Sequence, residues 1–259
     1  FNSTIDSAHT TPATFQSLTI NTDGETTFND QIGFYDKLSS LTVQGVTALN
    51  DGNTVINATT INTTDFQLYN NPVTLVSDTT LNSSAAGDVT FNSTIDSAHT
   101  TPATFQSLTI NTDGETTFND QIGFYDKLSS LTVQGVTALN DGNTVINATT
   151  INTTDFQLYN NPVTLVSDTT LNSSAAGDVT FNSTIDSAHT TPATFQSLTI
   201  NTDGETTFND QIGFYDKLSS LTVQGVTALN DGNTVINATT INTTDFQLYN
   251  NPVTLVSDT

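Results

Sequence analysis

The strongest constraint on this chain is a 90-residue repeat without a single substitution. Residues 1–90 recur as 91–180 and again from 181 to 259, so the chain holds two whole units and 79 residues of a third. Every residue type therefore occurs at equivalent places separated by a constant interval, whereas an enzyme pocket needs a unique set of side chains at one place. A period of this regularity predicts an array in which each unit buries its faces against the next.

Weaker echoes inside the unit indicate smaller layers. A large apolar residue followed by Asn recurs at intervals of 20–27 residues, at Phe1, Phe28, Leu49, Tyr69 and Phe91. A second echo has a central aliphatic residue, at Ile20, Val43, Ile61 and Leu81. Sub-repeats of this length match one coil of a stacked repeat. We expect about four coils per 90 residues, with the eight echo positions of the first unit pointing inward.

The fold class follows from the local patterns. Runs such as 17–21 and 40–44 alternate apolar and polar residues with the period of a half-buried strand, and no stretch keeps the apolar spacing of a helix. Gly24, Gly45, Gly52 and Gly87 stand beside Asp, Asn or Thr or close to them, as is typical of tight corners. The sequence predicts an all-β parallel β-helix, in which the units 1–90, 91–180 and 181–259 form one continuous solenoid.

Composition agrees with an outer surface of polar ladders. Each unit has 19 Thr, 10 Asn and 8 Ser, whose hydroxyls and amides can pair between identical neighbours on successive coils. The alternative is a disordered, mucin-like Ser/Thr-rich stalk. The hydrophobic content of 34% and the strict register of the apolar residues favour the folded solenoid.

The repeat also resembles a known class of proteins. The run LYNNPVTLVSDTTL at 68–81, followed by AGDVTFNSTID at 86–96, resembles the β-strand repeats of very large bacterial surface proteins. Those repeats are similar in turn to filamentous haemagglutinin-like adhesins and autotransporter passengers. The resemblance continues through 17–22 and 26–29 and so covers the unit. It implies a right-handed parallel β-helix, secretion, and an adhesive or structural role, with the segments 6–14 and 33–37 lengthening two coils.

Charge and composition exclude several classes of partner. Each unit carries eight Asp and one Glu against one Lys, and the chain has a net charge of −23. Nucleic-acid binding and adsorption to anionic lipid both need clustered Lys and Arg, which are absent from the sequence. No apolar run of about 18 residues is present, so we expect no membrane insertion. The sequence has no Cys, so neither disulfides nor a zinc set support the fold.

Candidate chemistry is sparse. Asp23 and Glu25 flank a Gly turn, and Asp51 precedes another, as do the oxygen ligands of some calcium loops. None of the three fits a calcium-binding consensus, so ordinary corners are the favoured interpretation and no cofactor is expected. Asp6 and His9 lack a companion nucleophile. We therefore expect no catalytic site and no enzyme activity.

One aromatic pair remains to be placed. It recurs in each unit, at Phe34, Tyr35, Phe124, Tyr125, Phe214 and Tyr215. Because the pair lies in a lengthened coil, it could pack inside or protrude as a lateral contact. The sequence leaves both possibilities open.

Three functions fit these observations. The leading one is an extracellular structural filament or stalk, whose partner is another copy by head-to-tail or axial stacking. The second is a repeat adhesin that binds a glycan or a cell surface. The third is ice binding by outward Thr ladders, against which the unequal coil lengths count because they are expected to put the Thr rows out of register.

Overall fold

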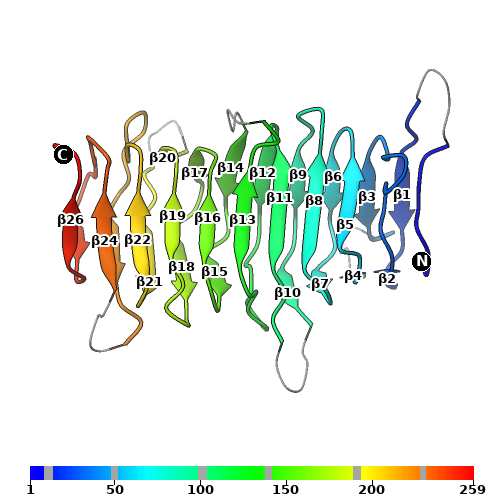
Figure 1. The fold of residues 1–259 in the computed structure, drawn as a ribbon, viewed down its shortest axis with the longest axis horizontal. Coiled ribbons are helices and arrows are strands. Elements are labelled where there is room, and N and C mark those ends of the chain that lie inside the picture. Colours follow the sequence, from blue (N-terminus) through cyan, green and yellow to red (C-terminus); the bar gives the residue numbers. More distant parts are fainter. Residues whose placement is uncertain (9–13, 48–51, 99–103, 138–141, 189–193, 228–231) are drawn as a thin grey trace.

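The chain forms an all-β rod. The computed structural model describes residues 1–8, 14–47, 52–98, 104–137, 142–188, 194–227 and 232–259, and every regular element in these ranges is a β-strand. All strand pairs are parallel. The strands follow one another along the long axis from the N-terminal to the C-terminal end (Figure 1). The predicted parallel β-solenoid is confirmed.

The strands line three long faces. Face one is a nine-stranded sheet of β5 (Thr60–Thr63), β8 (Thr79–Ser83), β11 (Leu108–Thr112), β13 (Leu131–Gln134), β16 (Gln157–Tyr159), β19 (Val179–Phe181), β22 (Glu205–Phe208), β24 (Asn233–Ile236) and β26 (Val253–Leu255). Face two is an eight-stranded sheet of β1 (Leu18–Asn21), β3 (Leu41–Gln44), β6 (Gln67–Tyr69), β9 (Val89–Phe91), β12 (Glu115–Phe118), β14 (Asn143–Ile146), β17 (Val163–Leu165) and β20 (Ile185–Ser187).

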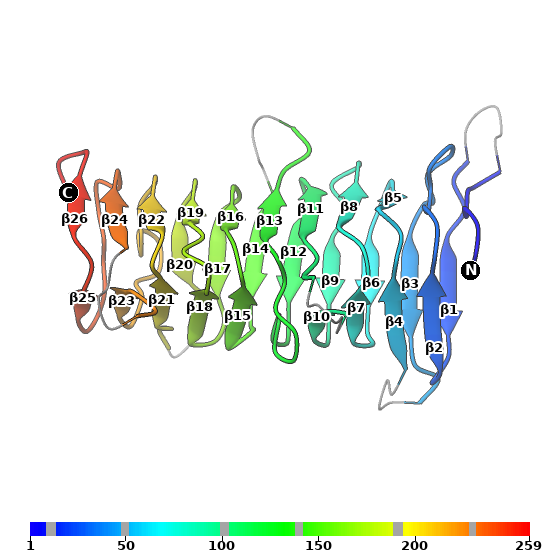
Figure 2. The same cartoon turned by 60° about the horizontal axis from the view of Figure 1, so that its bottom comes forward.

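Face three consists of two shorter sheets. They are β2 (Glu25–Phe28), β4 (Asn53–Ile56), β7 (Val73–Leu75) and β10 (Ile95–Ser97), then β15 (Thr150–Thr153), β18 (Thr169–Ser173), β21 (Leu198–Thr202), β23 (Leu221–Gln224) and β25 (Gln247–Tyr249). Ile122 forms a parallel bridge to Ile95 on one side and to Ile151 on the other, and so joins the two sheets. Figure 2 brings this face forward.

Alternation of side chains explains the strands. In β8 and β11 the residues are alternately buried and half-buried: Thr80, Asn82, Thr109 and Asn111 face outward, and the inward residues are aliphatic in the middle of each strand, with buried Thr or Ser at strand ends. Thr, Val and Ile fit this pleated, half-covered surface because their branched side chains pack well on it. The inward residues of all three faces meet in one continuous hydrophobic core along the rod.

Stacked aromatic rings form part of that core. The ring centroids of Tyr69 and Phe91 lie 5.0 Å apart, and those of Phe91 and Phe118 lie 5.8 Å apart. The buried Tyr69 hydroxyl donates a hydrogen bond to Gln67 Oε1 at 2.9 Å. Burial raises the pKa of Tyr69, because the ionised phenolate would lose its hydration. The stack of aromatic rings therefore contains a buried hydroxyl, that of Tyr69, whose hydrogen bond to Gln67 is formed.

Of the eight expected inward positions, five are fully buried as predicted: Phe28, Val43, Ile61, Tyr69 and Leu81. The expectation is wrong for Phe1, which is 53% exposed, and only partly met by Ile20, which is half-buried. Both lie on the outermost coil, where only one side has a neighbour; their equivalents Phe91 and Ile110 are buried. Leu49 lies outside the described residues.

The coil register differs from the one that the echoes indicate. Val43 pairs with Tyr69, and Phe28 pairs with Ile56, so the first echo does not run from Phe28 through Leu49 to Tyr69. Residues of both echoes lie next to each other on the same face, as Val43 and Tyr69 do, so neither echo marks a face of its own. Residue identity could not separate them, because all three faces use the same apolar-then-Asn pattern.

The second unit contributes eleven stacked inward positions, one from each of the strands β9 to β18 and one from the bridge at Ile122. In the second unit they are Phe91, Ile95, Ile110, Phe118, Ile122, Val133, Ile146, Ile151, Tyr159, Leu165 and Leu171. Successive positions pass around the three faces in turn. The unit therefore makes three and two-thirds coils, close to the four expected, and advances the rod by about 18 Å at about 4.8 Å per coil.

Because eleven is not a multiple of three, equivalent residues turn by one face per unit. The sequence ETTF forms β2 on face three, β12 on face two and β22 on face one. Strand β9 begins in the first 90-residue unit and ends in the second. The units are thus segments of one solenoid, and a face repeats its sequence only after three units.

Extra residues lie at the corners and leave the faces in register. Only 20 residues separate Ile61 from Leu81, but 29 separate Leu81 from Ile110, and both pairs are direct neighbours on face one. The outward residues of this face form a column of Thr60, Thr80, Thr109, Thr132, Leu158, Thr180, Thr207, Val235 and Thr254. The expectation that unequal coils would put the Thr rows out of register is therefore wrong.

Candidate interaction surface

Amide side chains form hydrogen-bonded ladders on the outside of the rod. The residue after an inward position is Asn or Gln at eight successive coils of face one: Asn62, Asn82, Asn111, Gln134, Asn160, Asn182, Asn209 and Asn237. From Asn82 onward, each side-chain NH₂ donates to the amide oxygen of the preceding member, at 2.5–3.0 Å. The sequence analysis predicted polar ladders of this kind, and their amides are confirmed to pair between neighbouring coils.

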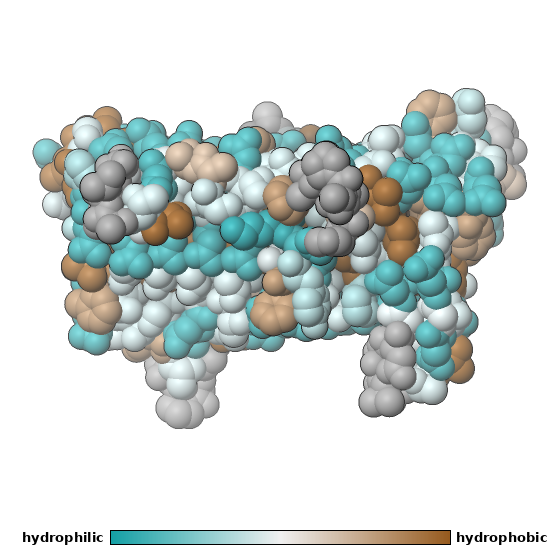
Figure 3. Space-filling model, turned by 90° about the horizontal axis from the view of Figure 1, so that it is seen from below, coloured by the Kyte–Doolittle hydropathy of each residue, from teal (hydrophilic) through white to brown (hydrophobic). Residues whose placement is uncertain are grey.

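The same ladder occurs on the other faces, displaced along the axis. On face three it runs from Asn152 to Asn250 through four hydrogen bonds of 2.7–3.2 Å. Figure 3 shows a hydrophilic band over β15 to β25 that ends near the middle of the molecule. A ladder of satisfied amides leaves few free donors or acceptors, so the ladder itself offers little for a ligand.

The row of amides is interrupted for three coils on faces two and three. On face three the residues that follow the inward positions are then Val76, Asp96 and Gly123 instead of an amide. Gly123 has a φ of +65°, and an added Cβ would lie 2.3 Å from the Asn152 carbonyl oxygen. This left-handed glycine turns the chain out of the coil before Phe124 and Tyr125. We call these three coils the ladder break.

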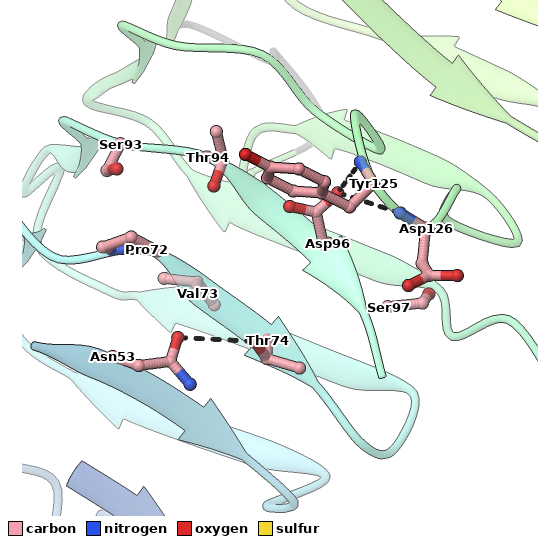
Figure 4. A pocket seen from close by; sticks show the side chains of 10 residues that line it. All are labelled: Asn53, Pro72, Val73, Thr74, Ser93, Thr94, Asp96, Ser97, Tyr125 and Asp126. Atoms are coloured by element: carbon pink, nitrogen blue, oxygen red, sulfur yellow. Dashed lines mark hydrogen bonds between the residues drawn. The ribbon is translucent and has the colours of Figure 1, made fainter. Parts of the chain in front are cut away.

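A groove lies at the ladder break of face three. It has a volume of about 510 Å³ and is lined by Asn53, Pro72, Val73, Thr74, Ser93, Thr94, Asp96, Ser97, Tyr125 and Asp126. Figure 4 shows the Tyr125 ring beside Asp96, with Thr94 on the other side. The strands β4, β7 and β10 form its floor, and the loop that follows Ile122 forms one wall.

Asp96 holds that wall in place. Its Oδ1 accepts hydrogen bonds from the backbone N–H of Tyr125 at 2.8 Å and of Asp126 at 3.3 Å. Burial raises the pKa of Asp96, and these hydrogen bonds oppose the rise because they stabilise the carboxylate. Asp96 is 8% exposed, and its two backbone hydrogen bonds fix the carboxylate at the edge of the groove.

The site recurs one unit later on a different face. Asp186 Oδ1 accepts from the N–H of Tyr215 at 2.9 Å and of Asp216 at 3.2 Å, and the groove there has a volume of about 370 Å³. This second groove lies on β17 and β20, which belong to face two. Near the N-terminal end, Asp6 makes the same contact with Tyr35 at 2.9 Å, but the described chain has no coil before it to complete the groove.

The aromatic pairs protrude from the rod. Phe124 is 52% exposed and Tyr125 78%, and their rings meet edge to face with centroids 4.8 Å apart. The pairs at Phe34 and Tyr35, and at Phe214 and Tyr215, have nearly the same exposure and geometry. Of the two alternatives that the sequence left open, the structure shows protrusion. Contact with a partner stays a prediction.

The weak calcium candidates serve as corner residues. Asp23 Oδ1 accepts from the backbone N–H of Val46 at 2.7 Å, and Glu25 Oε1 accepts from the Thr27 hydroxyl at 3.0 Å. Asp51 and His9 lie outside the described residues. Within the described part, no group of three or more His, Cys, Asp or Glu side chains is placed to hold a metal ion.

Sequence analysis missed the groove residues Asp96, Pro72 and Asn53. A signal was present, because Asn or Gln follows eight of the eleven inward positions and fails at Val76, Asp6 and Gly33. It could not be recognised without the correct coil register, which makes Val76 and the next unit's equivalents, Asp96 and Gly123, consecutive along one face.

Comparison with known protein families, curated proteins and solved structures gave no match. The resemblance to bacterial surface repeats therefore stays an expectation from the sequence. In the described part of the chain, no helix has the length and apolar character needed to cross a membrane.

Proposed function

We propose that this chain is a length of non-enzymatic extracellular rod, a stalk or filament whose identical coils provide length and stiffness. The observation that carries the proposal is the continuity of the solenoid: one hydrophobic core runs through it, and β9 crosses the boundary between two units. Because the core continues from one unit to the next, the rod has no hinge between units, and its length grows in proportion to their number. Bacterial surface location follows from the resemblance and belongs to the same proposal.

Axial self-association is part of this proposal. Strands β26 and β25 end their sheets and each leaves one edge unpaired within the described chain. Such an edge pairs with a further parallel strand, whether that strand belongs to the same chain or to another copy. The hydrophobic side chains of the last coil, such as Leu255, would then be covered as Leu165 is covered inside the rod.

Arrays of increasing length test the proposal. Chains of three and six units, measured by small-angle X-ray scattering and electron microscopy, should be straight rods that differ in length by about 53 Å, for eleven coils of about 4.8 Å. A string of beads, or a length that does not grow in proportion to the number of units, would contradict a continuous rod.

Ice binding is the second candidate, and one observation favours it. The outward Thr residues of face one stand in register on neighbouring coils, so the objection from unequal coils no longer applies. Their repeat along the axis is about 4.8 Å. Thermal hysteresis and ice-recrystallisation assays on the intact chain test it directly, with Thr109→Lys and Thr132→Lys as disruptive substitutions in the column. Absence of both activities in the unaltered chain would refute it.

A further inference from the structure

The groove at the ladder break combines an exposed aromatic ring with carboxylates. Tyr125 is 78% exposed, whereas Asp96 is nearly buried and held by two backbone N–H groups. Asp126 also lines the groove. The aromatic face and the fixed carboxylate stand side by side, as Figure 4 shows.

We propose that each such groove binds a lysine or arginine side chain of a partner protein. The cation would lie against the Tyr125 ring, whose π face attracts positive charge, and would contact the Asp96 carboxylate by a charge-assisted hydrogen bond. Thr94 and Thr74 supply further hydroxyl oxygens in the groove. This assignment goes beyond the proposed rod function and holds for a stalk and for an adhesin alike.

Electrostatics favour a cation over a neutral ligand. The chain carries a net charge of −23 with a single Lys per unit, so its field attracts positively charged partners. Burial disfavours the charged form of Asp96, and an incoming cation offsets that cost. A neutral sugar could stack on Tyr125 but would gain nothing from the charge, so glycan binding is the competing outcome of the test.

The rotation of the units gives the sites a particular arrangement. The two complete grooves lie on faces three and two, a third of a turn apart around the rod and about 18 Å apart along it. Because the two grooves open on different faces, they act as separate sites, and the intact chain should bind two copies of a short basic peptide.

Calorimetric titration of the intact chain tests the assignment, with hexalysine as the probe and maltohexaose as the neutral counterpart. The main variant carries Tyr35→Ala, Tyr125→Ala and Tyr215→Ala, and a second carries Asp6→Asn, Asp96→Asn and Asp186→Asn. We expect hexalysine affinity to fall by about two- to fivefold in the Tyr→Ala variant, which loses an exposed cation–π contact, and by about tenfold or more in the Asp→Asn variant, which loses a charged hydrogen bond. Affinity should also fall with salt, because the Debye length is about 8 Å at 0.15 M.

Three comparisons separate specific binding from general attraction. The matched charge control is Asp30→Asn, Asp120→Asn and Asp210→Asn, since Asp120 lies outside the groove and caps only the N–H of Gln121. Tyr→Phe at the three aromatic positions keeps a π face and should keep most of the affinity. Replacing Lys37, Lys127 and Lys217 by Gln should raise it, because each removes a like charge in the groove loop.

The outcomes decide the proposal. Loss in the Tyr→Ala and Asp→Asn variants, with less than about a twofold change in the charge control, supports it. An equal loss in the control and the groove variants would show non-specific attraction and overturn it. Tyrosine-dependent binding of maltohexaose without tyrosine-dependent binding of hexalysine would also overturn it, in favour of a glycan site. Should the alanine variant fail to fold, the Asp→Asn groove variant and its matched charge control decide the same question.

Discussion

The repeat offers a test in which local sequence is held constant and only tertiary position differs. Phe1, Phe91 and Phe181 have the same sequence after them, yet Phe91 and Phe181 are 1% exposed whereas Phe1 is 53% exposed. Phe91 stacks on Tyr69 and Phe118, and Phe1 stacks on Phe28 alone. Substitution by Ala should therefore have unequal effects at the three sites.

The magnitudes follow from burial. A buried Phe→Ala change costs about 3–5 kcal/mol, and loss of two stacked neighbours places Phe91→Ala toward the upper end. Phe1 has about half of its surface covered and one stacked neighbour, so Phe1→Ala should cost roughly half as much, about 1.5–2.5 kcal/mol.

Urea unfolding of the intact chain, followed by circular dichroism and tyrosine fluorescence, measures the difference. Phe181→Ala is the internal control and should match Phe91→Ala, because its rings and burial are the same. A cost for Phe1→Ala equal to that for Phe91→Ala, or a cost below about 1 kcal/mol for Phe91→Ala, would refute the stacked core.

Two further predictions each compare a pair of single substitutions. Thr144 Oγ1 is buried without a hydrogen-bond partner among the described residues, so Thr144→Val should be neutral or stabilising by up to about 1 kcal/mol. The Thr153 hydroxyl donates to the Asp155 carbonyl at 2.6 Å, so Thr153→Val should destabilise by about 1–3 kcal/mol. Thermal melts in which Thr144→Val lowers stability as much as Thr153→Val would contradict the hydrogen-bond assignment. Gly123→Ala should lower the free energy of unfolding by more than about 1 kcal/mol, because Gly123 has a φ of +65° and the added Cβ would meet a carbonyl oxygen. In Gly24→Ala the added Cβ meets nothing closer than 3.4 Å, so the free energy of unfolding should change by less than about 0.5 kcal/mol. Similar melting shifts for the two variants would contradict the left-handed turn at Gly123.

Much of the fold could be predicted because it rests on local alternation. Thr80, Leu81 and Asn82 show in three letters which side chain faces the core and which faces outward, and the structure places them so. The number of coils was close for the same reason. The prediction of which strands are neighbours was wrong. Val43 could pair with any apolar residue of the next coil, and the number of residues at the corners decides that its partner is Tyr69.

The groove could not be predicted because its residues are distant in sequence. Asn53, Thr74 and Asp96 come from three coils, and Tyr125 from a fourth. Their proximity depends on the parallel register of β4, β7 and β10 and on the bridge at Ile122. The exposure of Tyr125 was likewise undecided in the sequence, because an aromatic residue in a lengthened coil can fold in or out.

The sequence by itself determined that identical units stack as parallel β-coils, because alternating apolar and polar residues can bury one side only by pairing with equivalent neighbours. It also determined the strongly acidic surface. Only the tertiary structure decided how many strands fit one turn, because corner geometry is set by how residues far apart in the chain pack. Because eleven inward positions are distributed over three faces, each unit is rotated by one face relative to the unit before it. The identical sequences around Tyr125 and Tyr215 therefore point in different directions.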